Sequence, residues 1–121
     1  MASTESRILR AAEFIRANLA QRITLGTIAA LLGISRFTLS RSFRSVMHVS
    51  FRQYLLQHRI QWACLLLQRR DRSITDIALM VGFGDLPRFD KVFKRQTGLS
   101  PSDYRKKLLA KAATLGTTVA M

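Results

Sequence analysis

The stretch TLGTIAALLGI, residues 24–34, has a counterpart in SITDIALMVGF, residues 73–83. Three pairs of residues coincide at an offset of 49: Ile28 with Ile77, Ala29 with Ala78, and Gly33 with Gly82. Each copy begins with a hydroxyl residue that can cap a helix, and each carries a glycine just after its last apolar turn. Both copies therefore predict a short helix that ends in a glycine turn.

The repeat continues into the segment that follows each turn, where the offset becomes 50. The matched pairs are Leu39 with Phe89, Arg41 with Lys91, Phe43 with Phe93, Arg44 with Lys94, and Tyr54 with Tyr104. The second copy thus contains one added residue between its glycine and its first helical aromatic. Two helices joined by a short turn with glycine form a helix-turn-helix, whose second helix enters the major groove of DNA. The chain is predicted to contain this motif twice.

Signals for helix starts recur along the chain, while no stretch alternates apolar and polar residues for long. Capping residues predict helices that begin after Thr24, Ser35, Ser50, Ser73, Asp85 and Ser100. A further amphipathic helix is predicted over residues 6–20. We therefore expect an all-α protein of about seven helices. The expected organisation is an N-terminal helix-turn-helix lobe at 6–49, a connecting helix at 50–69, a C-terminal helix-turn-helix lobe at 70–109 and a flexible tail at 110–121.

The charge of the chain favours a polyanionic partner. Its 121 residues carry 20 Lys and Arg against 7 Asp and Glu, which gives a net charge of +13. No carboxylate lies between Phe14 and Arg70, whereas nine arginines occupy positions 16–70. Nucleic acid is the commonest partner of a chain with this balance.

Other functional classes find little support in the sequence. The single cysteine, Cys64, excludes an internal disulfide, and the longest apolar runs are too short to cross a bilayer. We therefore expect an intracellular protein without a membrane partner. His48 and His58 have no companion cysteines or acids at metal-ligand spacing, and no nucleophile, base and acid are arranged for catalysis. We expect no enzyme, no metal and no cofactor.

Cationic residues share each predicted second helix with apolar residues at helical spacing. Phe89 and Phe93 are expected to anchor one of these helices against its lobe, and Leu39 and Phe43 the other. The side chains expected to face DNA are then Arg36, Ser40, Arg41 and Arg44 in the first copy, and Arg88, Lys91, Lys94 and Arg95 in the second.

The second half of the chain resembles the signature of the AraC-type transcriptional regulators. The matching positions are Arg59-Ile60, Ala63-Cys64, Leu67, Ile74, Ile77-Ala78, Gly82-Phe83, Phe89, Phe93, Lys94-Arg95, Gly98, Ser100-Pro101 and Tyr104. The first copy, IAALLGISRFTLSRSF at residues 28–43, is similar to the weaker N-terminal unit of that family. The resemblance covers about residues 6–109. Because that leaves no room for a ligand-binding domain, the chain looks like the stand-alone subgroup of the family.

The resemblance implies a monomeric, sequence-specific regulator of transcription, an activator that also touches RNA polymerase in the bacterial cytoplasm, at the nucleoid. Its two recognition helices would enter successive major grooves of double-stranded DNA at an asymmetric bipartite site. The base-reading candidates, carried over by position, are Arg36, Phe37, Ser40 and Arg41 in the first helix, and Leu86, Arg88 and Lys91 in the second. The candidates for phosphate contacts are Ser35, Arg44, Lys94 and Arg95.

Three alternatives remain open at this point. Charge alone would suit a non-specific or architectural nucleic-acid-binding protein, whose affinity would be similar for any duplex and would fall steeply with salt. The chain could equally be the DNA-binding fragment of a larger, ligand-responsive regulator. A third possibility is an adaptor that engages RNA polymerase before it engages DNA.

Overall fold

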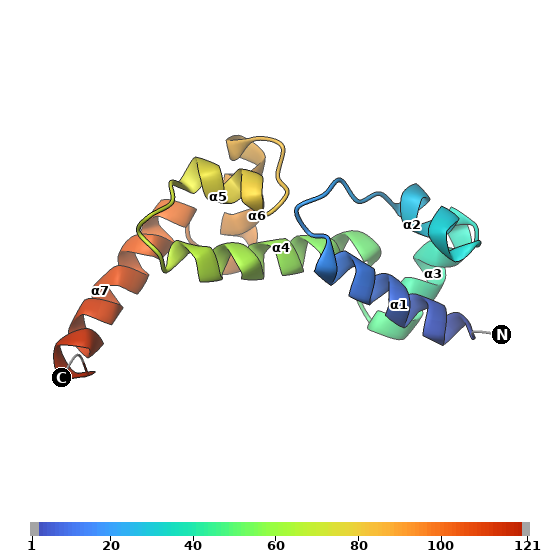
Figure 1. The fold of residues 1–121 in the computed structure, drawn as a ribbon, viewed down its shortest axis with the longest axis horizontal. Helices are drawn as coiled ribbons and strands as arrows, with labels where there is room; N and C mark the ends of the chain where they lie inside the picture. Colours follow the sequence, from blue (N-terminus) through green and yellow to red (C-terminus); the bar gives the residue numbers. More distant parts are fainter. Residues whose placement is uncertain (1–2, 120–121) are drawn as a thin grey trace. The chain divides into compact units, whose positions relative to one another are not determined.

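The computed structural model describes residues 3–119, with side chains through Thr114, and over that range the backbone forms seven α-helices and no strand (Figure 1). The helices are α1 (Thr4–Ala17), α2 (Leu25–Leu32), α3 (Arg36–Met47), α4 (Phe51–Leu67), α5 (Ile74–Met80), α6 (Leu86–Thr97) and α7 (Pro101–Val119). The all-α prediction is confirmed. The chain divides into two compact units, Met1–Arg59 and Ile60–Met121, which we call lobe 1 and lobe 2. The division falls within α4.

The predicted capping residues start the helices where expected. The Ser50 hydroxyl accepts from the Gln53 N–H at 3.1 Å, and the Gln53 side chain accepts from the Ser50 N–H at 3.2 Å, which completes a capping box. The same bond from the third helical N–H to the cap oxygen recurs at Thr24, Ser35, Ser73, Asp85 and Ser100. These local bonds satisfy N–H groups that have no acceptor within their own helix.

Helix bounds differ from the sequence prediction at both ends of the chain. Ser3 accepts from the Ser6 N–H, so α1 begins at Thr4 rather than at residue 6, and it ends at Ala17 rather than at 20. At the other end, α7 continues to Val119 through most of the range predicted as a flexible tail, and residues 120–121 lie outside the described part. The segment LLAKAA at 108–113 consists of strong helix formers and contains no proline. Helix propensity therefore carries α7 past the last charged residue.

The core of lobe 1 forms around Phe43 of α3, which is fully buried. Its ring meets the edges of Phe51, at 5.7 Å between centroids, and Tyr54, at 5.3 Å. Ile8 and Ile15 bring the apolar face of α1 into the same cluster. Edge-to-face aromatic pairs of this kind add to the free energy gained by burial, by about 0.5–1.5 kcal/mol each.

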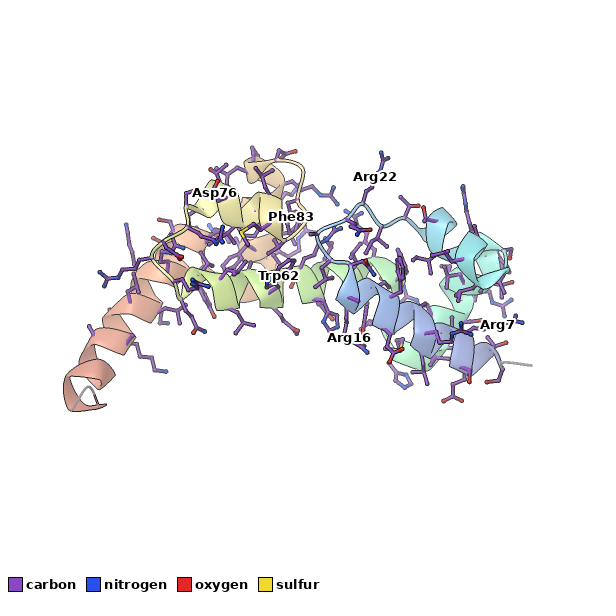
Figure 2. The ribbon with its side chains drawn as sticks, in the orientation of Figure 1. Arg7, Arg16, Arg22, Trp62, Asp76 and Phe83 are labelled. Atoms are coloured by element: carbon purple, nitrogen blue, oxygen red, sulfur yellow. The ribbon has the colours of Figure 1, made fainter. Side chains whose placement is uncertain are left out.

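Lobe 2 repeats this arrangement around Phe93 of α6. The ring of Phe93 meets Tyr104 at 5.3 Å and 83°, as Phe43 meets Tyr54 at 5.3 Å and 73°. Phe83, which points into the interior of lobe 2, packs edge-on against Phe89 at 5.2 Å (Figure 2). The internal repeat of the sequence is therefore also a repeat of packing.

Each lobe also holds the segment before its helix-turn-helix with an arginine. In lobe 1, the Nε of Arg59 donates to the Leu19 carbonyl at 3.0 Å and its Nη2 donates to the Gln21 carbonyl at 2.8 Å. In lobe 2, Arg105 donates in the same way to the carbonyls of Leu67, at 3.1 Å, and Arg69, at 2.9 Å. Both arginines grip two carbonyls spaced two residues apart. Arg59 and Arg105 are not repeat partners in the sequence. The two lobes therefore make the same kind of contact with arginines at different positions of the repeat.

The C-terminal caps of α3 and α6 permit a direct test of the repeat. His48 adopts a left-handed conformation with φ of 64°, and Gly98, its repeat partner, has φ of 85°. A side chain costs energy there and glycine does not. We expect His48→Gly to raise the free energy of unfolding by about 0.5–1 kcal/mol, and Gly98→Ala to lower it by about 1 kcal/mol. Urea denaturation measures both changes. A shift of the same sign in both variants would contradict the matched left-handed caps at His48 and Gly98.

Lobe 1 contains a histidine whose protonation opposes folding. The ring of His58 lies 4.2 Å from that of Tyr54, whose hydroxyl accepts a hydrogen bond from Arg16. Burial lowers the pKa of His58 below its ordinary 6.5, and the nearby positive charge of Arg16 lowers it further. The unfolded chain then binds the proton more readily than the folded chain, so stability is present above pH 6.5 and is lost as the pH falls through the folded pKa.

We therefore expect the thermal midpoint to fall as the pH is lowered from about 7 to about 5, and His58→Gln to reduce that dependence. His48→Asn is the matched control, because His48 is exposed and asparagine tolerates its left-handed backbone. Thermal scans across the pH range would detect the effect. An unchanged slope in His58→Gln would show that other groups cause the pH dependence.

Candidate nucleic-acid interface

The first helix-turn-helix consists of α2, a three-residue turn and α3. Gly33 ends α2 with φ of 68°, and the Ile34 N–H donates back to the Ala29 carbonyl at 3.1 Å. The hydroxyl of Ser35 accepts from the Thr38 N–H at 3.0 Å and donates to the Thr38 hydroxyl at 2.9 Å. This turn fixes where α3 begins and which of its faces is buried.

One face of α3 is buried and the other presents the predicted DNA-contacting residues. Leu39 and Phe43 have no exposed surface. Arg36, Phe37, Ser40, Arg41 and Arg44 are all exposed, at positions that recur along one side of the helix. The structure thus brings the first set of candidates onto one surface.

Phe37 belongs to the exposed face and not to the core. Its side chain is 68% exposed, and the guanidinium carbon of Arg41 lies 5.3 Å from the centre of its ring. A cation over an aromatic face is held by about 0.5–1 kcal/mol at an exposed site. Phe37 therefore orients Arg41, and both side chains are exposed on the same face of α3.

Arg36 lies differently from its neighbours on α3. Its Nε and Nη2 atoms are 2.8 and 2.9 Å from the point where a Cβ on Gly26 would lie. The guanidinium therefore rests on the first turn of α2. Sequence reasoning missed this contact, although a glycine in a helical turn that needs no positive φ was a signal for it.

The second helix-turn-helix consists of α5, a longer turn and α6. The Phe83 N–H donates to the Ala78 carbonyl at 2.9 Å, which is the repeat of the bond between Ile34 and Ala29. Gly82 has φ of 98°. The Asp85 carboxylate accepts from the Arg88 N–H at 2.8 Å and caps α6. The added residue of this copy thus lies between the shared turn and the cap.

The two faces of α6 separate as those of α3 do. Phe89, Val92 and Phe93 are buried. The exposed candidates are Arg88, Lys91, Lys94 and Arg95, while Leu86 is half-buried at the start of the helix. Pro87, in the first turn, removes no hydrogen bond of the helix, since that N–H has no intrahelical acceptor. The second set of candidates also shares one surface.

Very little of the positive charge is neutralised within either lobe. Lobe 1 contains nine arginines and two glutamates in its sequence. An ion pair joins Arg69 and Asp71 at 3.1 Å, and both side chains are more than half exposed. Arg22, in the segment between α1 and α2, adds a further projecting cation (Figure 2). The candidate cations are therefore available to an external anion.

Among the described residues, the features of a membrane span and of a metal site are absent. The described helices include none with the length and apolar character needed to cross a membrane. The described side chains form no group of three or more His, Cys, Asp or Glu that could hold a metal ion. A hollow of about 620 Å³ lies beside α1 and α2, and its lining includes Phe14 and Leu31 but none of the candidate DNA-contacting residues.

The chain is similar to known helix-turn-helix proteins. The family model described as "Helix-turn-helix domain" matches residues 28–107. Regulatory protein SoxS of Salmonella typhimurium is 34% identical over 96 residues, which cover 79% of this chain and 90% of that protein. Regulatory protein SoxS of Escherichia coli is 36% identical over 88 residues, or 73% of this chain and 82% of that protein.

Solved structures share the fold. The C-terminal domain of AraT, a response regulator from Geobacillus stearothermophilus, is 31% identical with a TM-score of 0.81, and the match covers 84% of each chain. The DNA-binding domain of AdpA, a global transcriptional factor solved in complex with a target DNA, is 30% identical with a TM-score of 0.82. That match covers 86% of this chain and 94% of the AdpA domain.

Proposed function

The chain belongs to the AraC family of helix-turn-helix, DNA-binding transcriptional regulators, and we propose that it acts as a monomer that places α3 and α6 in successive major grooves. Its site would be bipartite and asymmetric, because the two recognition helices carry different side chains. The observation that supports this most directly is the duplicated arrangement. In each lobe, buried apolar side chains anchor a helix whose opposite face is exposed and cationic.

We propose that the two exposed faces divide between reading bases and gripping phosphates. Arg41 on α3 and Lys91 on α6 can donate to O6 and N7 of guanine, and Phe37 and Leu86 can touch a thymine methyl group. Arg36, Ser40 and Arg88 complete the base-reading set that the sequence predicts. Phosphate contacts fall to Ser35, Arg44, Lys94 and Arg95. The Ser35 oxygen caps α3 as an acceptor, and its one O–H is donated to the Thr38 hydroxyl, so a phosphate contact would turn that O–H from Thr38 toward the phosphate.

We also propose that the protein activates transcription in the bacterial cytoplasm by contacting RNA polymerase, without catalytic activity of its own. The hollow beside α1 and α2 is the candidate polymerase surface, since Leu31 is 62% exposed there and no DNA-contacting candidate lines it. A pull-down of RNA polymerase in the absence of DNA, compared with Leu31→Glu, tests this contact. Equal capture by both proteins would exclude that surface.

Selection from a pool of randomised duplexes at about 150 mM salt tests the DNA-binding proposal, because low salt would let the net charge hide specificity. Two enriched blocks with centres about one helical turn apart would support two reading lobes. A single block would mean that one lobe reads while the other only clamps, which would contradict the bipartite site. No enrichment would favour a non-specific, architectural protein instead.

A further inference from the structure

Gly26 lies directly beneath the guanidinium group of Arg36. It is the second residue of α2, in helical backbone that any amino acid can adopt. A Cβ there would lie within 3 Å of two guanidinium nitrogens of Arg36, closer than a real Cβ approaches such atoms. With glycine at position 26, the Arg36 guanidinium lies directly on the first turn of α2, and a Cβ there would force this side-chain end to shift.

Charge does not explain this placement of Arg36. Lobe 1 contains no carboxylate side chain outside Glu5 and Glu13 of α1, and the ion pair between Arg69 and Asp71 lies in lobe 2. The start of a helix carries partial positive charge, so a cation gains no energy from the dipole of α2 at this end. The guanidinium lies in the space that Gly26 leaves open, and its side chain remains exposed.

We propose that Gly26 is a positioning residue for DNA binding, which leaves room for the Arg36 guanidinium over α2, where it contacts a backbone phosphate rather than a base. The proposal rests on the groove-reading role of α3 stated above. In a helix-turn-helix, the first helix crosses the DNA backbone while the second lies in the groove. Because the guanidinium rests on α2, Arg36 belongs with the residues that grip phosphates and leaves the base-reading set.

Arg41 and Arg36 of α3 have different neighbours. Arg41 lies over the ring of Phe37, on the exposed face of α3, whereas Arg36 lies over Gly26 on the preceding helix. Two arginines of one recognition helix are thus held by different neighbours. We infer that one reads sequence and the other fixes the position of the lobe on the duplex.

The test measures binding of the full chain to a selected duplex and to a scrambled duplex over a series of salt concentrations. Arg36→Ala should weaken binding to both duplexes about tenfold and reduce the slope of log affinity against log salt by about 0.9. Gly26→Ala should act in the same direction, by about threefold to fivefold, because the added methyl group displaces the guanidinium. In the Gly26→Ala/Arg36→Ala double variant, the alanine at 26 should have no further effect.

Two results would overturn the proposal. Arg36→Ala could weaken binding to the selected duplex alone, which would make Arg36 a base reader. Gly26→Ala could weaken binding equally with and without Arg36, which would mean that it acts through α2 itself. Misfolding is checked separately, since alanine should raise the unfolding midpoint of a helix that contains glycine. Failure of the proposed function would instead appear in the unaltered protein, as equal affinity for the selected and the scrambled duplex. The salt slopes of the single and double variants would still show whether residues 26 and 36 act together.

Discussion

Replacing Phe43 by alanine will lower the free energy of unfolding by about 3–5 kcal/mol, whereas Phe37→Ala will lower it by about 1 kcal/mol at most, the value of its contact with Arg41. Both phenylalanines lie on α3, but Phe43 is fully buried and Phe37 is 68% exposed. Loss of the Phe43 ring leaves a cavity against Phe51 and Tyr54, and it removes two edge-to-face contacts. Urea denaturation followed by circular dichroism measures both changes.

The repeat extends this prediction to lobe 2. Phe93→Ala should cost about as much as Phe43→Ala, because its ring is equally buried and makes the matching contact with Tyr104. Amide hydrogen exchange would locate each loss, with α3 losing protection in one variant and α6 in the other. A cost of Phe37→Ala as large as that of Phe43→Ala would contradict the assignment of the two faces of α3.

Replacing Arg41 by alanine will remove about 1–3 kcal/mol of discrimination against the wrong base in one half-site, and Lys91→Ala will do the same in the other. These values correspond to roughly a 5-fold to 150-fold loss of preference at the base pairs concerned. The expectation follows from the exposure of both side chains on the faces opposite Phe43 and Phe93. A second observation supports the expectation for Arg41, because its guanidinium lies over the ring of Phe37, which orients it.

Lys94→Ala is the matched control for these variants. Lys94 is exposed on α6 one turn beyond Lys91, and we expect it to grip a phosphate. Its removal should weaken binding to all duplexes alike and lower the salt slope by about 0.9. Competition binding with single-base variants of the selected site distinguishes the two behaviours. If Arg41→Ala and Lys91→Ala weakened binding uniformly, as Lys94→Ala is expected to, the base-reading assignment would be wrong.

The sequence predicts much of this protein because its strongest signals are local. A capping side chain and the N–H that it satisfies are three residues apart, as at Ser50 and Gln53. The anchors Phe43 and Phe93 are marked by helical spacing and by the repeat itself. Such features depend on short segments, so composition and periodicity reveal them before any tertiary contact is known.

Contacts between distant segments and the choice of rotamer were decided only by the tertiary structure. The grip of Arg59 on the Leu19 and Gln21 carbonyls joins residues about 40 positions apart. The Arg59 and Arg105 donors do not obey the repeat, so no pattern in the sequence predicts that they act alike.

The presence of seven helices, the six predicted N-caps from Thr24 to Ser100 and the two cationic faces were determined by the sequence alone, since each depends on the identities of residues within one or two turns. Whether Phe37 joined the core, and where the Arg36 guanidinium came to rest, depended on the space left by other helices. The Arg36 guanidinium can lie against Gly26 only once α2 and α3 have packed together.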